Sequence, residues 1–118
     1  MKLITEAQQR QLLENGRKQR DLMGTDEEFD AMPVVKLFTP DANATWLLTE
    51  IDPDEPEIAF GLADLGLGHP ELGSLSLTEI RQVRGKLNLP VERDRGFQAD
   101  KTLSEYAKLA YQQRRIVT

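Results

Sequence analysis

The side chains that could do chemistry in this chain are mainly carboxylates, and they gather in its middle part. Hydrolases of sugars use two carboxylates at a defined separation, and Ca²⁺ takes several oxygens from one loop with a tight turn. The run DPDEPE at residues 52–57 guarantees neither arrangement. We therefore expect at most weak cation binding at high concentration, with no metal site and no cofactor.

An enzyme is still one of the functions that these residues leave open. A hydrolase or nuclease-like enzyme would use Asp41, Glu50, Glu71 and Glu92 around the polar turns. Such a site requires polar groups with perturbed pKa values that converge in a concave surface. The spacing in the sequence alone identifies no catalytic residue.

Histidine and cysteine chemistry is restricted by composition. His69 is the only histidine, and the chain has no cysteine, which excludes disulfides and thiolate metal sites. A lone histidine has no second nitrogen ligand to help it hold a transition metal. The glycines at 66, 68 and 73 match neither a Rossmann nor a Walker spacing, and we expect them to supply positive φ in a connection instead.

Four runs rich in β-branched, aromatic and aliphatic residues predict the strands that position these side chains. They cover residues 34–39, 45–51, 57–63 and 72–77, and turn formers separate them, as in an antiparallel meander. In the third run Ile58, Phe60 and Leu62 alternate with other residues, so we predict these three for the core. The second run has apolar residues on both faces, which indicates that both are partly covered.

Three local signals predict helices outside the sheet. Each has Ser or Thr followed three residues later by Glu or Gln, the pattern of a capping box. The pairs are Thr5 with Gln8, Ser76 with Glu79, and Thr102 with Glu105. The first helix is predicted to end near Arg20 and the second before Gly85, with a short extended piece at residues 91–93.

Together these elements predict an α+β fold with a small, mostly antiparallel sheet of about four to five strands, an N-terminal helix, a short middle helix and a C-terminal helix. The 118 residues suffice for one domain. We expect the N-terminal helix and a polar linker in residues 1–31, the sheet in 32–77, and helices with a short extended segment in 78–118. No apolar run approaches the ~20 residues of a membrane span, so we expect a cytoplasmic protein and no membrane partner.

Charge is segregated along the chain. Residues 1–20 carry five Lys/Arg and two Asp/Glu, residues 21–80 carry one and fourteen, and residues 81–118 carry nine and four, for a net charge of −5. Either the opposite signs attract within the fold, or an acidic face meets a basic protein partner. We do not expect nucleic-acid binding, because an acidic body lies behind the basic helices.

The predicted binding patch lies at one end of the sheet, around the turn between the first two strands. Trp46 follows this turn, and tryptophan is enriched in binding hot spots, although it is equally suited to a core. Glu50 extends the patch if that face is open, and the segment VERD at residues 91–94 either approaches it or pairs within itself. The predicted binding residues are Thr39, Asp41, Asn43, Trp46, Glu50, Arg93 and Asp94.

Several separate strings resemble one bacterial family. The chain contains, in order, FTPDANATWLLTEID, FGLADLGLGHPELGSLSLTEIRQVRG, LPVERDRGF and KTLSEYA. From about Val34 to Ala110 it resembles the bacterial domain of unknown function family 2958. The resemblance implies no agreed activity, frequent carriage on plasmids and other mobile elements, and proximity or fusion to anti-restriction and DNA-modification proteins. Ala63 stands where the family often has Cys and His69 where an aromatic is usual, which weakens any thiol or histidine chemistry.

The leading hypothesis is a non-enzymatic, protein-binding accessory module associated with mobile elements or anti-restriction systems. One alternative is the carboxylate-dependent hydrolase or nuclease-like enzyme described above. Another is an acidic DNA-mimic inhibitor, although mimicry normally needs a larger negative charge than −5. The sequence predicts no oligomeric state.

Overall fold

A computed structural model describes residues 2–25, 27 and 29–118, so part of the predicted linker at residues 24–28 lies outside the described residues. The elements lie close to their predicted places in the chain. In order they are α1 (Glu6–Leu22), β1 (Val35–Phe38), β2 (Thr45–Ile51), β3 (Ile58–Asp64), β4 (Glu71–Ser76), α2 (Leu77–Gln82), β5 (Glu92–Arg93) and α3 (Leu103–Gln113).

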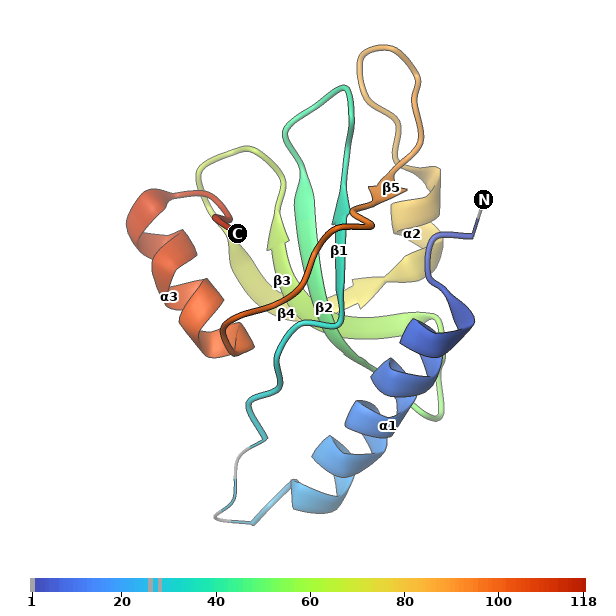
Figure 1. Cartoon of the computed structure of the whole chain (residues 1–118), viewed down its shortest axis with the longest axis vertical. Coiled ribbons are helices and arrows are strands. Elements are labelled where there is room, and N and C mark those ends of the chain that lie inside the picture. Colours follow the sequence, from blue (N-terminus) through green and yellow to red (C-terminus); the bar gives the residue numbers. More distant parts are fainter. Residues whose placement is uncertain (1, 26, 28) are drawn as a thin grey trace.

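The strands form one antiparallel sheet in the order β4-β3-β2-β1-β5 (Figure 1). β1 to β4 make the predicted meander, and β5 is the short extended piece that pairs with β1 at the far edge. Leu37 lies opposite Trp46, and Leu47 lies opposite Leu62. The predicted α+β class, with its three helices, is confirmed.

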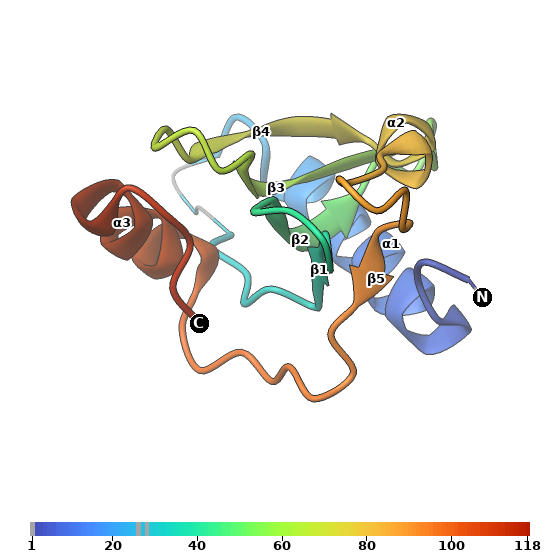
Figure 2. The same ribbon diagram turned by 90° about the horizontal axis from the view of Figure 1, so that it is seen from above.

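Helices cover both faces of the sheet. Seen from above, α1 lies on one side of the strands and α3 on the other (Figure 2). The core cluster between the sheet and the helices α1 and α2 comprises Leu12, Val35, Leu37, Trp46, Leu48, Ile51, Ala59, Leu77, Ile80 and Val91. The cluster between the sheet and α3 comprises Leu47, Leu62, Leu103, Tyr106, Ala107 and Ala110. The mixed pattern of β2 is explained because its neighbouring residues are buried on opposite faces.

The predicted N-cap residue stands at the start of each of the three helices. The Thr5 Oγ1 accepts a hydrogen bond from the Gln8 N–H at 3.1 Å, and the Gln8 Oε1 accepts one from the Thr5 N–H at 3.0 Å. Ser76 Oγ accepts from the Glu79 N–H at 3.1 Å, but the reciprocal bond of the predicted box is not present among the described residues. At the third helix Glu105 Oε1 accepts from the Thr102 N–H at 3.0 Å. These bonds satisfy N–H groups that have no partner within a helix.

A β-bulge in β2 anchors α1 to the sheet. The pairing of β2 with β3 shifts register between Leu48 and Glu50. The buried Asn15 of α1 donates from Nδ2 to the Thr49 carbonyl at 2.9 Å. One residue further, Gly16 lies so close to β2 that a Cβ there would be 2.0 Å from the Ile51 carbonyl oxygen. The helix therefore packs directly on the strand backbone, which only glycine permits.

The predicted core of β3 is right for Leu62 and wrong for Phe60. Leu62 is fully buried under α3, Ile58 is half-buried, and Phe60 is 37% exposed. The three share one face because they alternate, but the cluster under α3 includes only Leu62. The neighbours of Phe60 on the adjoining strands are Glu50 and Ser74, which add no apolar cover.

Two of the three glycines expected to supply positive φ do so. Gly66 and Gly68 have φ values of 80° and 84° in the connection between β3 and β4. Gly73 lies within β4 instead, paired with Gly61, so the expectation for it is wrong. β4 begins at Glu71, so the connection ends before Gly73 is reached.

Candidate functional site

The structure distributes the seven predicted binding residues over several places. Thr39, Asn43 and Asp94 line one polar cleft. Glu50 lines a second depression on the sheet, and Arg93 lines a groove beside α1. The other two residues lie apart from these hollows, Asp41 against a loop and Trp46 in the core.

Trp46 is 3% exposed and packs in the core under α1. It lies opposite Leu37 on β1 and Ala63 on β3, so its ring is enclosed by the sheet and the helices. This burial corresponds to the core alternative considered for Trp46. As it stands, the side chain offers almost no surface to a partner.

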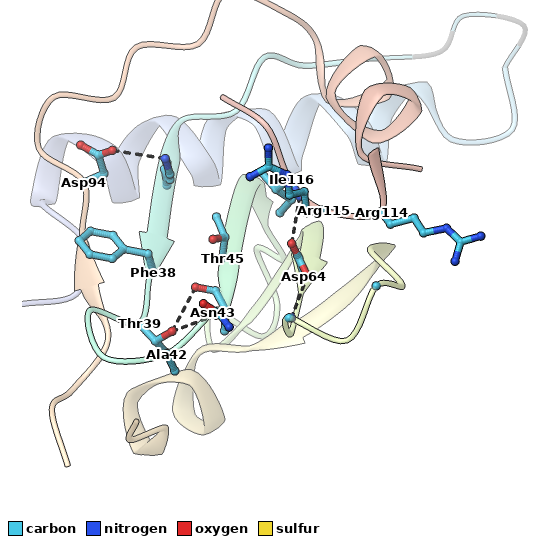
Figure 3. A pocket seen from close by; sticks show the side chains of 14 residues that line it. Phe38, Thr39, Ala42, Asn43, Thr45, Asp64, Asp94, Arg114, Arg115 and Ile116 are labelled. Carbon is cyan, nitrogen blue, oxygen red and sulfur yellow. Dashed lines mark hydrogen bonds and ion pairs between the residues drawn. The ribbon is translucent and has the colours of Figure 1, made fainter. Parts of the chain in front are cut away.

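The polar cleft has a volume of about 690 Å³ and lies where the C-terminal tail crosses the ends of the strands (Figure 3). Asp64 is 4% exposed, and its two carboxylate oxygens accept hydrogen bonds from the Gly66 and Ile116 N–H groups at 2.8 and 2.9 Å. Asp64 thus ties the tail to the β3–β4 connection. A carboxylate with both oxygens occupied in this way has a structural role here.

Three further polar residues of the cleft, Lys36, Asp94 and Thr39, also make contacts within the fold. The Lys36 Nζ lies 3.5 Å from Asp94 Oδ2 and donates to Thr118 Oγ1 at 2.7 Å. Thr39 Oγ1 accepts from the Ala44 N–H at 2.9 Å, which closes the β1–β2 turn. These contacts of the cleft therefore hold the β1–β2 turn, β1 and the C-terminal tail in place.

Asp41 fixes the loop after α2. Its Oδ2 accepts hydrogen bonds from the Leu87 and Leu89 N–H groups at 2.6 and 3.2 Å. A Cβ at Gly85 would lie 1.9 Å from the Asp41 Oδ1, an oxygen that is buried and has no hydrogen-bond partner among the described residues. Asp41 and Gly85 thus form a tight contact between the β1–β2 turn and this loop.

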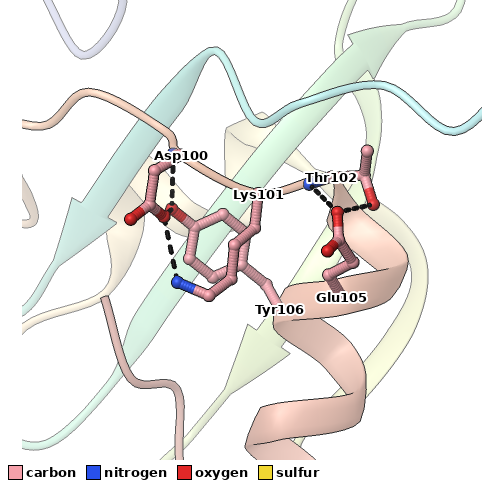
Figure 4. Close-up of polar contacts among 5 residues, drawn as sticks. All are labelled: Asp100, Lys101, Thr102, Glu105 and Tyr106. Carbon is pink, nitrogen blue, oxygen red and sulfur yellow. Dashed lines mark hydrogen bonds and ion pairs between the residues drawn. The ribbon is translucent and has the colours of Figure 1, made fainter.

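A further polar network lies at the N-terminal end of α3 (Figure 4). Tyr106 donates from its hydroxyl to Asp100 Oδ1 at 2.9 Å, and Lys101 Nζ lies 3.0 Å from the same oxygen. The hydrogen bond from Lys101, followed by that from Tyr106, lowers the pKa of Asp100, while burial raises the pKa of Tyr106. All of these groups stabilise the first turn of α3, beside the Thr102 and Glu105 cap.

The depression around Glu50 contains acceptors that lack a partner among the described residues, although Arg20 and Asp52, which also line it, are paired with each other. It has a volume of about 310 Å³ and lies between the end of α1 and strands β2 to β4. Burial raises the pKa of the half-buried Glu50, and no ion pair or hydrogen bond to its carboxylate is present among the described residues. The Gln19 Oε1, which is also buried, likewise has no donor in the described part of the chain.

The same depression exposes apolar surface. Its lining includes Phe60 and Met23, which are 37% and 71% exposed. Sequence reasoning included Glu50 but missed these two residues. The cross-strand pairing of Phe60 with Glu50 would have indicated that Phe60 shares a polar environment, but that pairing depends on the bulge in β2.

A family described as Protein of unknown function (DUF2958) matches residues 3–117 of the 118-residue chain. The chain belongs to the DUF2958 family. The match extends well beyond the strings that carry the resemblance and includes α1. No curated protein and no solved structure matches the chain.

The four carboxylates proposed for a hydrolase do not meet in this DUF2958 protein. Glu50 lines the small depression, whereas Glu92 lies across the sheet in the groove beside α1. Asp41 holds a loop, and Glu71 is exposed at the start of β4. Among the residues that the structure describes, no group of three or more His, Asp or Glu side chains is placed to hold a metal ion.

In the fold of the DUF2958 chain, basic residues of the helices form ion pairs with acidic residues of the sheet region. Arg20 of α1 lies 2.9 Å from Asp52 and 3.0 Å from Asp54, and Arg81 of α2 lies 2.7 Å from Glu57. Exposed pairs of this kind contribute little to stability, but they neutralise much of the acidic β2–β3 turn. No helix in the described part of the chain has both the length and the apolar character needed to cross a membrane.

Proposed function

We propose that this chain is a non-enzymatic, protein-binding module that recognises a basic partner at the depression around Glu50. The observation that carries the proposal is an unpaired, half-buried carboxylate next to exposed Phe60. A monomer gains nothing from burying a carboxylate without a partner, because desolvation then costs free energy. A partner that supplies a cation would remove this cost.

The chemistry of the depression favours a lysine or arginine side chain with an apolar neighbour. Glu50 and the Gln19 Oε1 are both acceptors, and both lack donors among the described residues. Phe60 and Met23 offer apolar contact area beside them. A basic side chain would donate to the Glu50 carboxylate, which is only half-buried, while its methylene stem, or a neighbouring residue, packs on the apolar surface.

An accessory role is part of the same proposal. The family resemblance implies that such chains accompany mobile elements and anti-restriction or DNA-modification proteins. A partner from those systems would need a basic, partly apolar surface. Proteins that handle DNA are rich in basic surfaces, so this chemistry is compatible with such a partner.

The test is affinity capture from an extract of the native host with immobilised wild type and two charge reversals. Glu50→Lys alters the depression, whereas Glu14→Lys changes the same charge at an exposed position of α1 outside it. We expect a basic protein to be retained by the wild type and by Glu14→Lys and to be lost from Glu50→Lys. Circular dichroism checks that both variants are folded.

Quantitative mass spectrometry compares the proteins retained by the wild type, Glu14→Lys and Glu50→Lys. Retention should weaken at raised ionic strength, because the contact is electrostatic. The same set of proteins on wild type and Glu50→Lys would refute binding at this depression.

A further inference from the structure

A second hollow, of opposite charge, lies beside the first turn of α1. It has a volume of about 650 Å³, within the range of ligand-binding pockets, and is formed by the N-terminal segment, α2 and the region around β5. Figures 1 and 2 both show the N-terminal end of α1 close to β5. We call this hollow the arginine groove, after Arg81, Arg84 and Arg93 in its lining.

The floor of the arginine groove is apolar. Ile51, Leu77 and Val91 are buried core residues whose outer surfaces reach the groove, and Leu3 and Ile4 are partly buried beside them. Such a floor favours apolar side chains, because their contact removes hydrophobic surface from water. A binding site for a free inorganic anion has no need of it.

The arginines are held in place by the fold. Arg84 Nη1 donates to the Arg81 and Val83 carbonyls, both at 2.8 Å. Arg93 Nη1 donates to the Lys2 and Leu3 carbonyls at 2.8 and 3.3 Å. In these bonds each guanidinium uses Nη1, so its other nitrogens stay available for a bidentate contact with a carboxylate. Fixing the side chains in advance also reduces the entropy lost on binding.

The charge of the arginine groove is opposite to that of the whole chain. Its lining has four basic residues, Lys2, Arg81, Arg84 and Arg93, against two acidic ones, Glu57 and Glu92. Both oxygens of Glu57 already accept from Arg81 Nη1, at 2.9 and 2.7 Å. A chain of net charge −5 thus concentrates an excess of positive charge over an apolar floor.

We propose that the arginine groove binds an acidic peptide segment of a partner protein. A carboxylate of the peptide would pair with Arg84 and Arg93, and an apolar side chain next to it would contact Val91 and Leu77 on the floor. The proposal is independent of the depression around Glu50, which has the opposite charge and lies elsewhere on the molecule.

An acidic peptide fits these features better than a nucleic acid does. Phosphate backbones are held mainly by extended basic surfaces, whereas the basic residues here surround one short apolar hollow. The acidic residues 21–80 of the chain would also repel a long polyanion. A peptide segment needs only a few carboxylates and supplies the apolar side chain that the floor requires.

The test begins with a display library of random twelve-residue peptides, selected on the immobilised wild-type protein. We expect the selected sequences to be enriched in Asp or Glu next to Leu, Ile or Phe. Binding of one selected, fluorescein-labelled peptide is then measured by fluorescence polarisation. We expect Arg84→Gln to weaken its affinity by about tenfold or more, and Arg17→Gln, an equal change of charge on exposed α1, to leave it unchanged.

NMR shift mapping and a DNA-binding measurement test the proposal further. Amide chemical shifts of the ¹⁵N-labelled protein should move around Leu3, Leu77 and Val91 when the peptide is added. No enrichment of acidic peptides, or shifts confined to other surfaces, would overturn the proposal. Equally, binding of a labelled DNA duplex that is lost in Arg84→Gln would make the groove a phosphate site and overturn the assignment to a peptide.

Discussion

Replacing Gly16 by alanine tests the close contact between α1 and β2. In an exposed helix this change stabilises by about 1 kcal/mol, because alanine is the better helix former. At Gly16 the new Cβ would lie 2.0 Å from the Ile51 carbonyl oxygen and 3.1 Å from its carbon. Both atoms belong to the backbone of a central strand, so neither can move away as the tip of a flexible side chain can.

The loss of stability in Gly16→Ala follows from the movement of α1 away from β2. Overpacking of a well-packed contact costs about 1–3 kcal/mol. Moving α1 outwards also stretches the hydrogen bond from Asn15 to the Thr49 carbonyl, 2.9 Å long and buried, which is worth about 1 kcal/mol. After the gain in helix propensity, we expect Gly16→Ala to lower the free energy of unfolding by about 1–3 kcal/mol. The melting temperature should fall by about 3–10 °C.

Thermal and urea denaturation followed by circular dichroism measure this loss. The matched control is Gly73→Ala in β4, where a Cβ meets nothing within 4 Å and φ is not positive. We expect the control to be as stable as the wild type or slightly more stable. A Gly16→Ala protein that melts at or above the wild-type temperature would refute the contact between α1 and the β2 backbone.

Four further outcomes are expected. Trp46→Ala should lower the free energy of unfolding by about 3–5 kcal/mol in urea denaturation, because the side chain is buried, and a loss below 1 kcal/mol would contradict its place in the core. Phe60→Ala should cost only about 1–2 kcal/mol in the same assay, because its ring is partly exposed; a loss as large as that of Trp46→Ala would restore Phe60 to the core. Burial raises the pKa of Glu50, so the folded state binds its proton more tightly, and wild-type stability should fall as the pH rises from about 4.3 through the raised pKa. Glu50→Gln should therefore be more stable than the wild type at pH 7 and equal to it at pH 3, and equal stability at both would contradict the raised pKa. Chelation with EDTA should leave the melting curve unchanged, and a drop of several degrees would reveal a metal that stabilises the fold.

The fold was predictable from the sequence because its local signals agree with one another. Capping residues at Thr5, Ser76 and Thr102 set the helix starts, and turn formers separated the strands. These signals are short-range, so each can be read without knowledge of tertiary contacts. The fifth strand was predicted only as an extended piece, because two residues carry almost no periodicity.

The sites were harder to predict because they depend on which faces the helices cover. Alternation placed Phe60 with Leu62, but no sequence rule says how far α3 extends along that face. The bulge in β2 adds a second difficulty, since it changes the residue that faces Glu50. The arginine groove unites Lys2, Arg84 and Arg93 from distant parts of the chain, so its charge cannot be read from any single segment.

The position of α1 also sets an order for folding during synthesis. α1 leaves the ribosome before the strands, yet Asn15 must wait for Thr49, 34 residues later, before it can form its hydrogen bond. A 17-residue helix with few buried residues has little stability by itself. The nascent chain can therefore complete the α1 and α2 side once β5 has emerged, while Leu47 and Leu62 stay uncovered until α3 follows. During that interval the uncovered apolar face is where chaperones would bind the growing chain.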